Sequence, residues 1–311
     1  MLLSKIAKAV LDDAEARRMI RSSGAYPRAI EREVLATYAR LRRRKYFKAT
    51  RRADRLEQVM GASMRFTAYH TLDFLFREIF VEPSYSFRAG APTPRIIDCG
   101  SNIGMSVLFF KTLYPDAEIL AFEPGRTTFA LLAENVRRNA WEGVRVLPQA
   151  VAEYDGELEF FYDPGDPGSL LMSTFAERMP NGSSHRVEAV RLSRYIDAPV
   201  DFLKLDVEGA ELGVIRDLQR SGTLPLVREM VIEYHHHITP GVDALAELLG
   251  ILESGGFGYQ MNAEWHLPHR TGEFQDVLVH AYRGDTRDRR PRSPLEVSHG
   301  AIPEPVAHPY A

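Results

Sequence analysis

Short apolar runs alternate with helical patterns through the middle of the chain. Residues 95–99 form an apolar run that follows Pro94 and stops at Gly100, which is typical of a buried parallel strand. Apolar residues then recur at helical spacing from Ile103 until Pro115 ends the run, and a second strand follows. This alternation of strand, helix and strand predicts an α/β fold built on a parallel sheet.

The same alternation continues along the chain. We predict further strands at residues 118–122, 144–151, 158–162, 200–205 and 226–235, helices at 127–140, 212–218 and 244–252, and a closing pair of strands at 257–262 and 277–282. Together these elements predict a doubly wound, seven-stranded, mostly parallel sheet with a closing antiparallel strand. The domain that contains it spans residues 61–284.

The first sixty residues differ from this core in charge. Residues 2–20 and 27–60 read as helices, and residues 1–60 hold 16 Lys and Arg against 7 Asp and Glu. The remainder must therefore total −12 to give the net charge of −3. We assign residues 1–60 to a basic helical N-terminal extension. A solvated helix face explains the basic run better than nucleic-acid binding, because no nucleic-acid motif accompanies it.

Several flanking segments carry their own expectations. An apolar stripe at Leu35, Tyr38 and Leu41 leaves open a homo-oligomer formed through the N-terminal helices. Residues 64–80 are too apolar to stand free and should pack on the sheet. Turn clusters in residues 163–184 predict a mobile loop over the site, with a segment of no role as the alternative. Residues 285–311 are rich in Arg and Pro and should form a disordered tail.

Composition and the first residues of the chain bear on the cellular location of the protein. Hydrophobic residues make up 45% of the chain, which is ordinary for a globular protein. No apolar run approaches the ~20 residues of a membrane span. Met1 is not followed by the apolar stretch of a secretory signal, and the single cysteine, Cys99, rules out an intramolecular disulfide. We therefore expect a cytoplasmic protein.

Candidate chemistry gathers around the first predicted strand. Gly100 and Gly104 flank a turn at the start of a helix, where free N–H groups and a small backbone allow close approach of a ligand. Glu123, at the tip of the second strand, is placed to accept two ribose hydroxyls. Asn102 breaks the dinucleotide pattern G-x-G-x-x-G, and Asp98 would repel a pyrophosphate. Asp98 suits an ammonium instead, such as that of S-adenosylmethionine (SAM).

Two motifs carry a resemblance to a known family. The pattern D-x-G-x-N-x-G from Asp98 to Gly104, followed by Glu123, resembles the class I SAM-dependent methyltransferases with their Rossmann-like fold. The pattern D-x-x-K-x-D-x-E-G-x-E from Asp201 to Glu211 resembles the FkbM-type methyltransferases. The resemblance implies that SAM is the cofactor, bound by Asp98, Gly100, Ser101, Asn102, Ile103, Gly104, Glu123 and Pro124, with Gln149 and Ala150 facing adenine.

The expected catalytic residues follow two later strands. Asp206 ends one strand beside the ligand crevice, although Asp also serves there as a helix N-cap. Glu208 follows it, and His235 shares a strand face with Glu233, where a neutral imidazole could accept a hydroxyl proton. Asp206, Glu208 and His235 could instead hold a divalent metal. We rank a histidine base above a metal site and predict no metal.

The resemblance implies an activity but no named acceptor. We expect a SAM-dependent O-methyltransferase that acts on a hydroxyl of a sugar or natural-product acceptor, either a small molecule or a glycan. Two alternatives remain open at this point. One is an N-methyltransferase acting on a peptide or amine. The other is a non-catalytic SAM-binding scaffold whose basic N-terminal helices recruit a partner.

Overall fold

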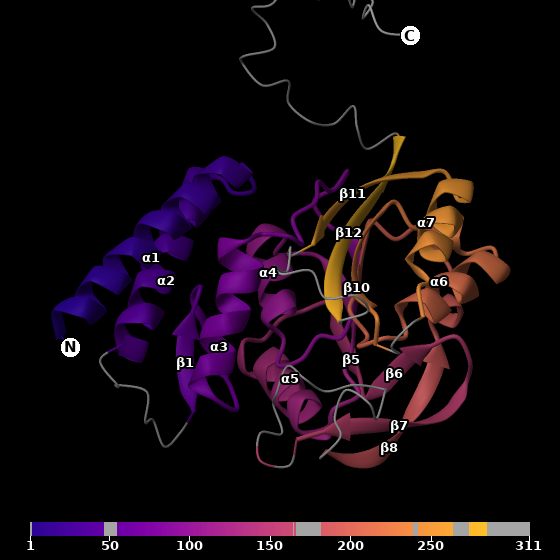
Figure 1. The fold of residues 1–311 in the computed structure, drawn as a ribbon, viewed down its shortest axis with the longest axis horizontal. Helices are drawn as coiled ribbons and strands as arrows, with labels where there is room; N and C mark the ends of the chain where they lie inside the picture. Colours follow the sequence, from indigo (N-terminus) through magenta and orange to yellow (C-terminus); the bar gives the residue numbers. More distant parts are fainter. Residues whose placement is uncertain are drawn as a thin grey trace, which may run out of the picture.

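The central sheet and the helices on its two faces are described by a computed structural model (Figure 1). The structure describes residues 2–46, 55–163, 165, 182–238, 242–263 and 274–284. The sheet contains β3 (Arg95–Cys99), β4 (Glu118–Phe122), β5 (Val144–Leu147), β9 (Phe202–Leu205), β10 (Glu229–His236), β11 (Phe257–Ala263) and β12 (Gln275–Arg283). Its strand order is β11-β12-β10-β9-β3-β4-β5. Strands β5, β4, β3, β9 and β10 are parallel, and β12 is antiparallel to both β10 and β11. The predicted seven-stranded sheet is confirmed.

Helices cover both faces of this sheet, as a doubly wound fold requires. They are α4 (Met105–Leu113), α5 (Arg126–Arg138), α6 (Glu211–Arg220) and α7 (Leu245–Ser254). Successive strand residues point to opposite faces. Ile96 accordingly joins a core cluster with residues of α4 and α5, whereas Ile97 joins a second cluster with residues of α6 and α7. Four of the five residues of β3 and all four residues of β9 are buried, as expected for strands covered on both faces.

A second, three-stranded sheet stands beside the first. It contains β6 (Gln149–Ala152), β7 (Gly156–Tyr162) and β8 (Ser183–Arg191) in the order β6-β8-β7. The single strand predicted at 144–151 is therefore wrong: it is divided between two sheets at Pro148, which has no N–H to donate to a ladder. Two short 3₁₀ helices, η3 (Leu192–Tyr195) and η4 (Leu224–Leu226), flank β9 in the chain.

The N-terminal segment contains two long helices and a hairpin. Its elements are α1 (Leu2–Ser23), α2 (Arg28–Tyr46), β1 (Leu56–Val59), β2 (Ala62–Arg65), α3 (Tyr69–Phe76) and the π-helix η1 (Arg77–Val81). The prediction of one helix over 27–60 is wrong at 56–59, where β1 pairs with β2 through a turn at Met60 and Gly61, both at positive φ. Residues 47–54 lie outside the described residues.

The N-terminal helices share the core of the sheet domain. Leu35, Tyr38 and Leu41, the predicted apolar stripe, are buried in the same cluster as Phe80 and Phe109. The stripe is therefore covered within the chain by its own residues. A homo-oligomer through these helices stays a prediction, as does the division of the chain into three segments.

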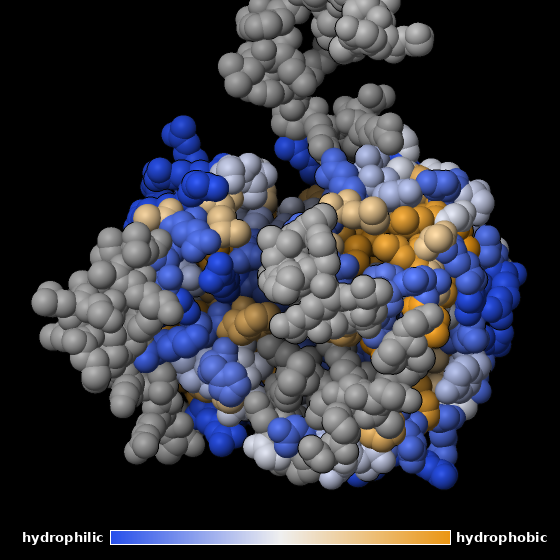
Figure 2. All heavy atoms as spheres, in the orientation of Figure 1, coloured by the Kyte–Doolittle hydropathy of each residue, from blue (hydrophilic) through white to orange (hydrophobic). Residues whose placement is uncertain are grey.

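Part of the basic run is paired within the chain. Arg42 and Lys45 form ion pairs with the buried Asp73, and Arg44 pairs with the buried Glu57. These cations tie α2 to α3 and to the hairpin instead of all facing solvent. Figure 2 shows a largely hydrophilic surface over the N-terminal helices on this side of the molecule.

Two expectations concern other parts of the chain. Most of the loop predicted at 163–184, and the tail predicted at 285–311, lie outside the described residues. Among the residues that the structure describes, no helix has both the length and the hydrophobicity needed to cross a bilayer.

Candidate active site

A cavity of about 260 Å³ opens at the carboxyl edge of the parallel strands. This is where open α/β sheets bind their ligands. The turns after β3, β4 and β9 form its walls together with Glu233 and His235 of β10, and η1 and β6 add two further sides. Its lining includes the predicted residues Gly100, Ser101, Asn102, Glu123, Pro124, Gln149, Ala150, Asp206, Glu208 and His235. The structure thus brings together ten predicted residues from five separate segments.

The turn after β3 depends on glycine at one position above all. Gly100 has a φ of +88°, and a Cβ placed there would lie 1.9 Å from the backbone oxygen of Asp206. The turn after β3 therefore packs directly against the turn after β9. Asn102 also has positive φ, 48°, which Asn tolerates better than most residues. This tight turn exposes its backbone to the cavity.

Glu123 anchors the opposite side of that turn. Its Oε2 accepts a bond from the backbone N–H of Asn102 at 2.7 Å, and its Oε1 accepts bonds from the N–H of Gly125 and the hydroxyl of Thr128. Burial raises the pKa of Glu123 to about 7, although these three hydrogen bonds favour the ionised form. Glu123 is thus fixed in place and titrates near neutral pH.

Asp98 lies behind the cavity wall, together with Ile103 and Gly104. Its Oδ2 accepts a bond from the hydroxyl of Ser106, and its Oδ1 lies 3.6 Å from Nζ of Lys204. Asp98 on β3 and Lys204 on β9 are register partners in the sheet. The expectation that Asp98 faces the ammonium of a ligand therefore needs correction, because the ammonium beside it belongs to Lys204.

Lys204 is the buried cation of the site. Its Nζ donates to the backbone oxygen of Gly100 at 2.8 Å and to Oδ2 of Asp206 at 3.1 Å. Burial by itself would lower the pKa of Lys204, but the carboxylates of Asp206, Asp98 and Glu233 raise it above its usual value. Lys204 therefore stays charged and fixes the side chain of Asp206 at the end of β9.

Two further acids surround Asp206. Glu78 projects from η1, and burial followed by the charge of Asp206 raises its pKa to about 7. Burial, then Asp206 and Glu78, also raises the pKa of Glu233 well above its usual value. We call Asp206, Glu78 and Glu233 the acid cluster. Burial and the neighbouring carboxylates therefore favour the protonated forms of Glu78 and Glu233.

His235 is enclosed by carboxylates from three elements. Its Nδ1 lies 2.9 Å from Oε1 of Glu211, and its Nε2 lies 3.3 Å from Glu208 and 3.8 Å from Asp276. Burial alone would lower the pKa of His235, but Glu211 and Glu208 raise it well above its usual value. These carboxylates favour the imidazolium form of the ring over the neutral imidazole expected from the sequence. The catalytic role of His235 stays a prediction.

The same protonation bears on metal binding in the cavity. One oxygen or nitrogen each of Asp206, Glu208 and His235 lie within 4.8 Å of one another, as do those of Glu233, His235 and Asp276. An imidazolium has no lone pair for a metal. An ion would have to displace the proton from His235 and leave Glu211 without its charged partner. We derive no catalytic step through a metal.

Four residues that line the cavity were not predicted as site residues. Lys204, Glu78, Tyr85 and Asp276 all line the cavity. Lys204 is two positions before Asp206, and this period-2 spacing could have placed both on one face of the strand. Glu78 and Asp276 reach the cavity only through a π-helix and an antiparallel pairing, which no local pattern shows.

The sheet order, the glycine turn and the acid at the tip of β4 together define a class I methyltransferase. A family model described as the methyltransferase FkbM domain matches residues 98–259, which is more than half of the chain. The chain belongs to the FkbM methyltransferase family and is an enzyme of that class. This confirms the resemblance that the motifs around Asp98 and Asp206 indicated.

Curated relatives agree with this assignment. Methyltransferase sdnD of Sordaria araneosa is 32% identical over 226 residues, which cover 62% of this chain and 85% of the relative. The 31-O-demethyl-FK506 methyltransferase FkbM of Streptomyces tacrolimicus is 30% identical over 235 residues, covering 63% and 86%. A solved structure, methyltransferase FkbM from Methylobacillus flagellatus KT, has 15% identity and a TM-score of 0.44, covering 90% of this chain and 60% of its own.

Proposed function

We propose that this enzyme is a SAM-dependent O-methyltransferase that acts on a hydroxyl of a sugar or natural-product acceptor. One observation carries the proposal: the glycine turn, Glu123 and the acid cluster all line a single cavity. The glycine turn and Glu123 suit a nucleoside with an amino acid part, and the acid cluster suits a hydroxyl that must lose its proton. A cytoplasmic location, from the composition, belongs to this proposal.

The residues of the cavity fit SAM. Oε1 of Glu123 accepts two hydrogen bonds and Oε2 accepts one, so Oε2 retains an acceptor position for a ribose hydroxyl. The backbone of Gly100, Ser101 and Asn102 would hold the methionine part, and Gln149 and Ala150 would flank adenine. When bound, SAM supplies a methyl group already activated as a sulfonium.

The protein's own task is to orient the acceptor and take its proton. Lys204 fixes Asp206, which is placed to accept a hydrogen bond from the acceptor hydroxyl. Glu78, with a pKa of about 7, is matched to receiving a proton at neutral pH. His235 holds Glu208 in place through its Nε2. We therefore assign general-base catalysis to the acid cluster and a positioning role to His235.

Hydroxyl methylation is favoured over the alternatives by the acid cluster and by a relative. The name of the Streptomyces tacrolimicus relative places its methyl group on an oxygen of a natural product. A buried cation, Lys204, beside Asp206 would oppose a protonated amine acceptor, although the surrounding acids would attract one. A non-catalytic scaffold has no need of carboxyl groups held at raised pKa in its cavity.

The test is transfer of labelled methyl from SAM to a panel of matched acceptors. Each acceptor is offered as the alcohol, the corresponding amine and the O-methylated alcohol. Methyl transfer to the alcohol alone supports the proposal, whereas transfer to the amine alone would make the chain an N-methyltransferase. Binding of SAM without transfer to any member would leave the scaffold as the better account.

A further inference from the structure

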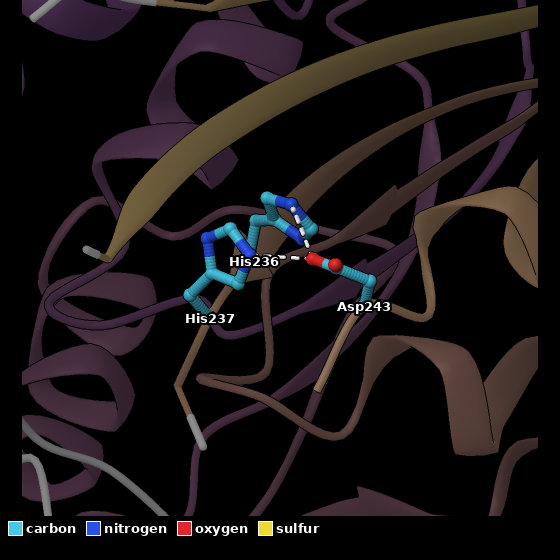
Figure 3. Close-up of side chains that lie close together, drawn as sticks. All are labelled: His236, His237 and Asp243. Atoms are coloured by element: carbon cyan, nitrogen blue, oxygen red, sulfur yellow. Dashed lines mark hydrogen bonds and ion pairs between the residues drawn. The ribbon is translucent and has the colours of Figure 1, made fainter. Parts of the chain in front are cut away.

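Two histidines and an aspartate converge at the end of β10, outside the candidate active site. Figure 3 shows the rings of His236 and His237 directed at one carboxylate oxygen of Asp243. Nε2 of His236 lies 3.4 Å from this oxygen, and Nε2 of His237 lies 2.5 Å from it. One ligand atom from each of the three residues lies within 4.8 Å of the others. None of the three lines the cavity.

An unusual backbone conformation creates this convergence. Adjacent residues of a strand point to opposite faces, so two neighbouring histidines should diverge. His237 has a φ of 59°, in the left-handed region that residues other than glycine seldom adopt. The turn brings the two rings to within 3.7 Å, centroid to centroid. Backbone strain of this kind is often retained where a site needs it.

We propose that His236, His237 and Asp243 form a zinc site. Imidazole nitrogen and carboxylate oxygen are ordinary zinc ligands, with bonds near 2.0–2.2 Å. In a tetrahedral site such bonds separate neighbouring ligand atoms by about 3.4 Å. The pair of His236 with Asp243 already has that separation, and the pair of His237 with Asp243 needs to open by about 1 Å. Water completes the coordination, because 75% of the Asp243 side chain is exposed.

The ion would join the end of β10 to the residue that precedes α7 by two positions. His235 directly precedes His236 on β10. Its side chain points the other way and lies in the cavity among Glu208, Glu211 and Asp276. Fixing His236 and His237 would thus hold the strand end that carries His235. The zinc site stabilises the active-site edge of the sheet without contacting the cavity, and it does not depend on the proposed acceptor.

The experiment is zinc titration of the metal-free full chain in competition with a chromophoric chelator. We expect one tight equivalent for the wild type, and at least about tenfold weaker binding for Asp243→Asn and His237→Asn. Asn tolerates positive φ, and Asp243 is exposed, so neither change should unfold the chain. Zinc should also raise the Tm of the wild type and not that of Asp243→Asn.

Two control variants separate this site from other zinc sites. The double variant Glu208→Gln with Asp276→Asn removes one ligand from each of the two potential ligand sets of the cavity, and His280→Asn removes a histidine that pairs with Glu229 elsewhere on the sheet. Both should bind zinc as the wild type does. Loss of the tight equivalent in the double variant, with binding retained in Asp243→Asn, would place the ion in the cavity and overturn the proposal. Absence of stoichiometric binding by the wild type would also overturn it.

Discussion

Replacing Glu123 by Gln should weaken SAM binding by about tenfold to a hundredfold. In the structure Oε2 has one donor, the N–H of Asn102, and one remaining acceptor position. An amide nitrogen at that position cannot accept a hydrogen bond from a ribose hydroxyl and also opposes the N–H of Asn102. A hydrogen bond to a charged group contributes about 1.5–3 kcal/mol, and each 1.4 kcal/mol is about tenfold in affinity.

Calorimetry of SAM binding measures this change, with thermal unfolding to confirm that the variant is folded. Gln is preferred to Ala because its oxygen keeps the bonds from Gly125 and Thr128. The matched control is Glu118→Gln, an exposed acid at the other end of the same strand. Glu118→Gln should bind as the wild type does. If Glu123→Gln also binds SAM within about twofold of the wild type, Glu123 is not the ribose acceptor.

The raised pKa of Glu123 adds a dependence on pH to the same experiment. The carboxylate is the form whose Oε2 keeps an acceptor position for a ribose hydroxyl, and the pKa of Glu123 without SAM is about 7. Affinity for SAM should therefore rise as pH increases through 7 and then level off. In Glu123→Gln this rise should be lost. A pH profile that is the same in the two proteins would show that another group controls binding.

Five further predictions concern the packing and charge of the site and of the N-terminal helices. Asp206→Asn and His235→Ala should each lower turnover by about 10²-fold, with much smaller changes in SAM affinity, as steady-state kinetics beside calorimetry would show. Turnover should rise with pH through about 7 in the wild type and lose that rise in Glu78→Gln. A carboxyl whose pKa is raised from 4.5 to about 7 by folding binds its proton more tightly in the folded chain. The free energy of unfolding, measured by chemical denaturation, should therefore decrease as pH rises from 4.5 to 7. This decrease should be less steep in Glu78→Gln. Gly100→Ala should abolish SAM binding or soluble expression, since its Cβ would overlap the backbone of Asp206. Deleting residues 2–46 should give insoluble protein, because it uncovers α3 and η1 and leaves the buried Asp73 without its cations; a soluble, SAM-binding truncation would contradict this.

The last of these differs from what the sequence indicated. Residues 1–60 read as a basic helical extension, because their charge pattern resembled a solvated helix face. Charge pattern does not show which cations find buried partners. Arg44 pairs with Glu57, and Arg42 and Lys45 pair with Asp73, 28 or more residues away. Such pairs depend on the tertiary packing of α2 against α3.

The parallel strands were predictable because they are buried on both faces. The short, mostly apolar runs of β3, β4 and β9 favour strands, and the glycine turn after β3 has its own local pattern. Strand β8 was missed because six of its nine residues are exposed or half-exposed polar side chains, and its partner β7 is distant in the chain. Its burial depends on a sheet that no local window contains.

The sequence predicted which residues line the site better than it predicted their protonation states. Period-2 spacing and strand ends identified Asp206, Glu208 and His235, which do line one cavity. The charge of His235 depends on Glu211, 24 residues earlier in the chain, and that of Glu78 on Asp206, 128 residues later. pKa values depend on three-dimensional proximity and burial, so the sequence alone could not show the carboxylates that favour the imidazolium form of His235.

The most direct test of the central claim is a single-turnover reaction with methyl-labelled SAM and a hydroxyl acceptor, analysed by mass spectrometry of the methylated product. The account predicts one methyl group on an acceptor oxygen, formed by the wild type and by Glu118→Gln. Product should fall by about 10²-fold in Asp206→Asn at saturating SAM. Full product from Asp206→Asn, or a methyl group on nitrogen alone, would contradict the account.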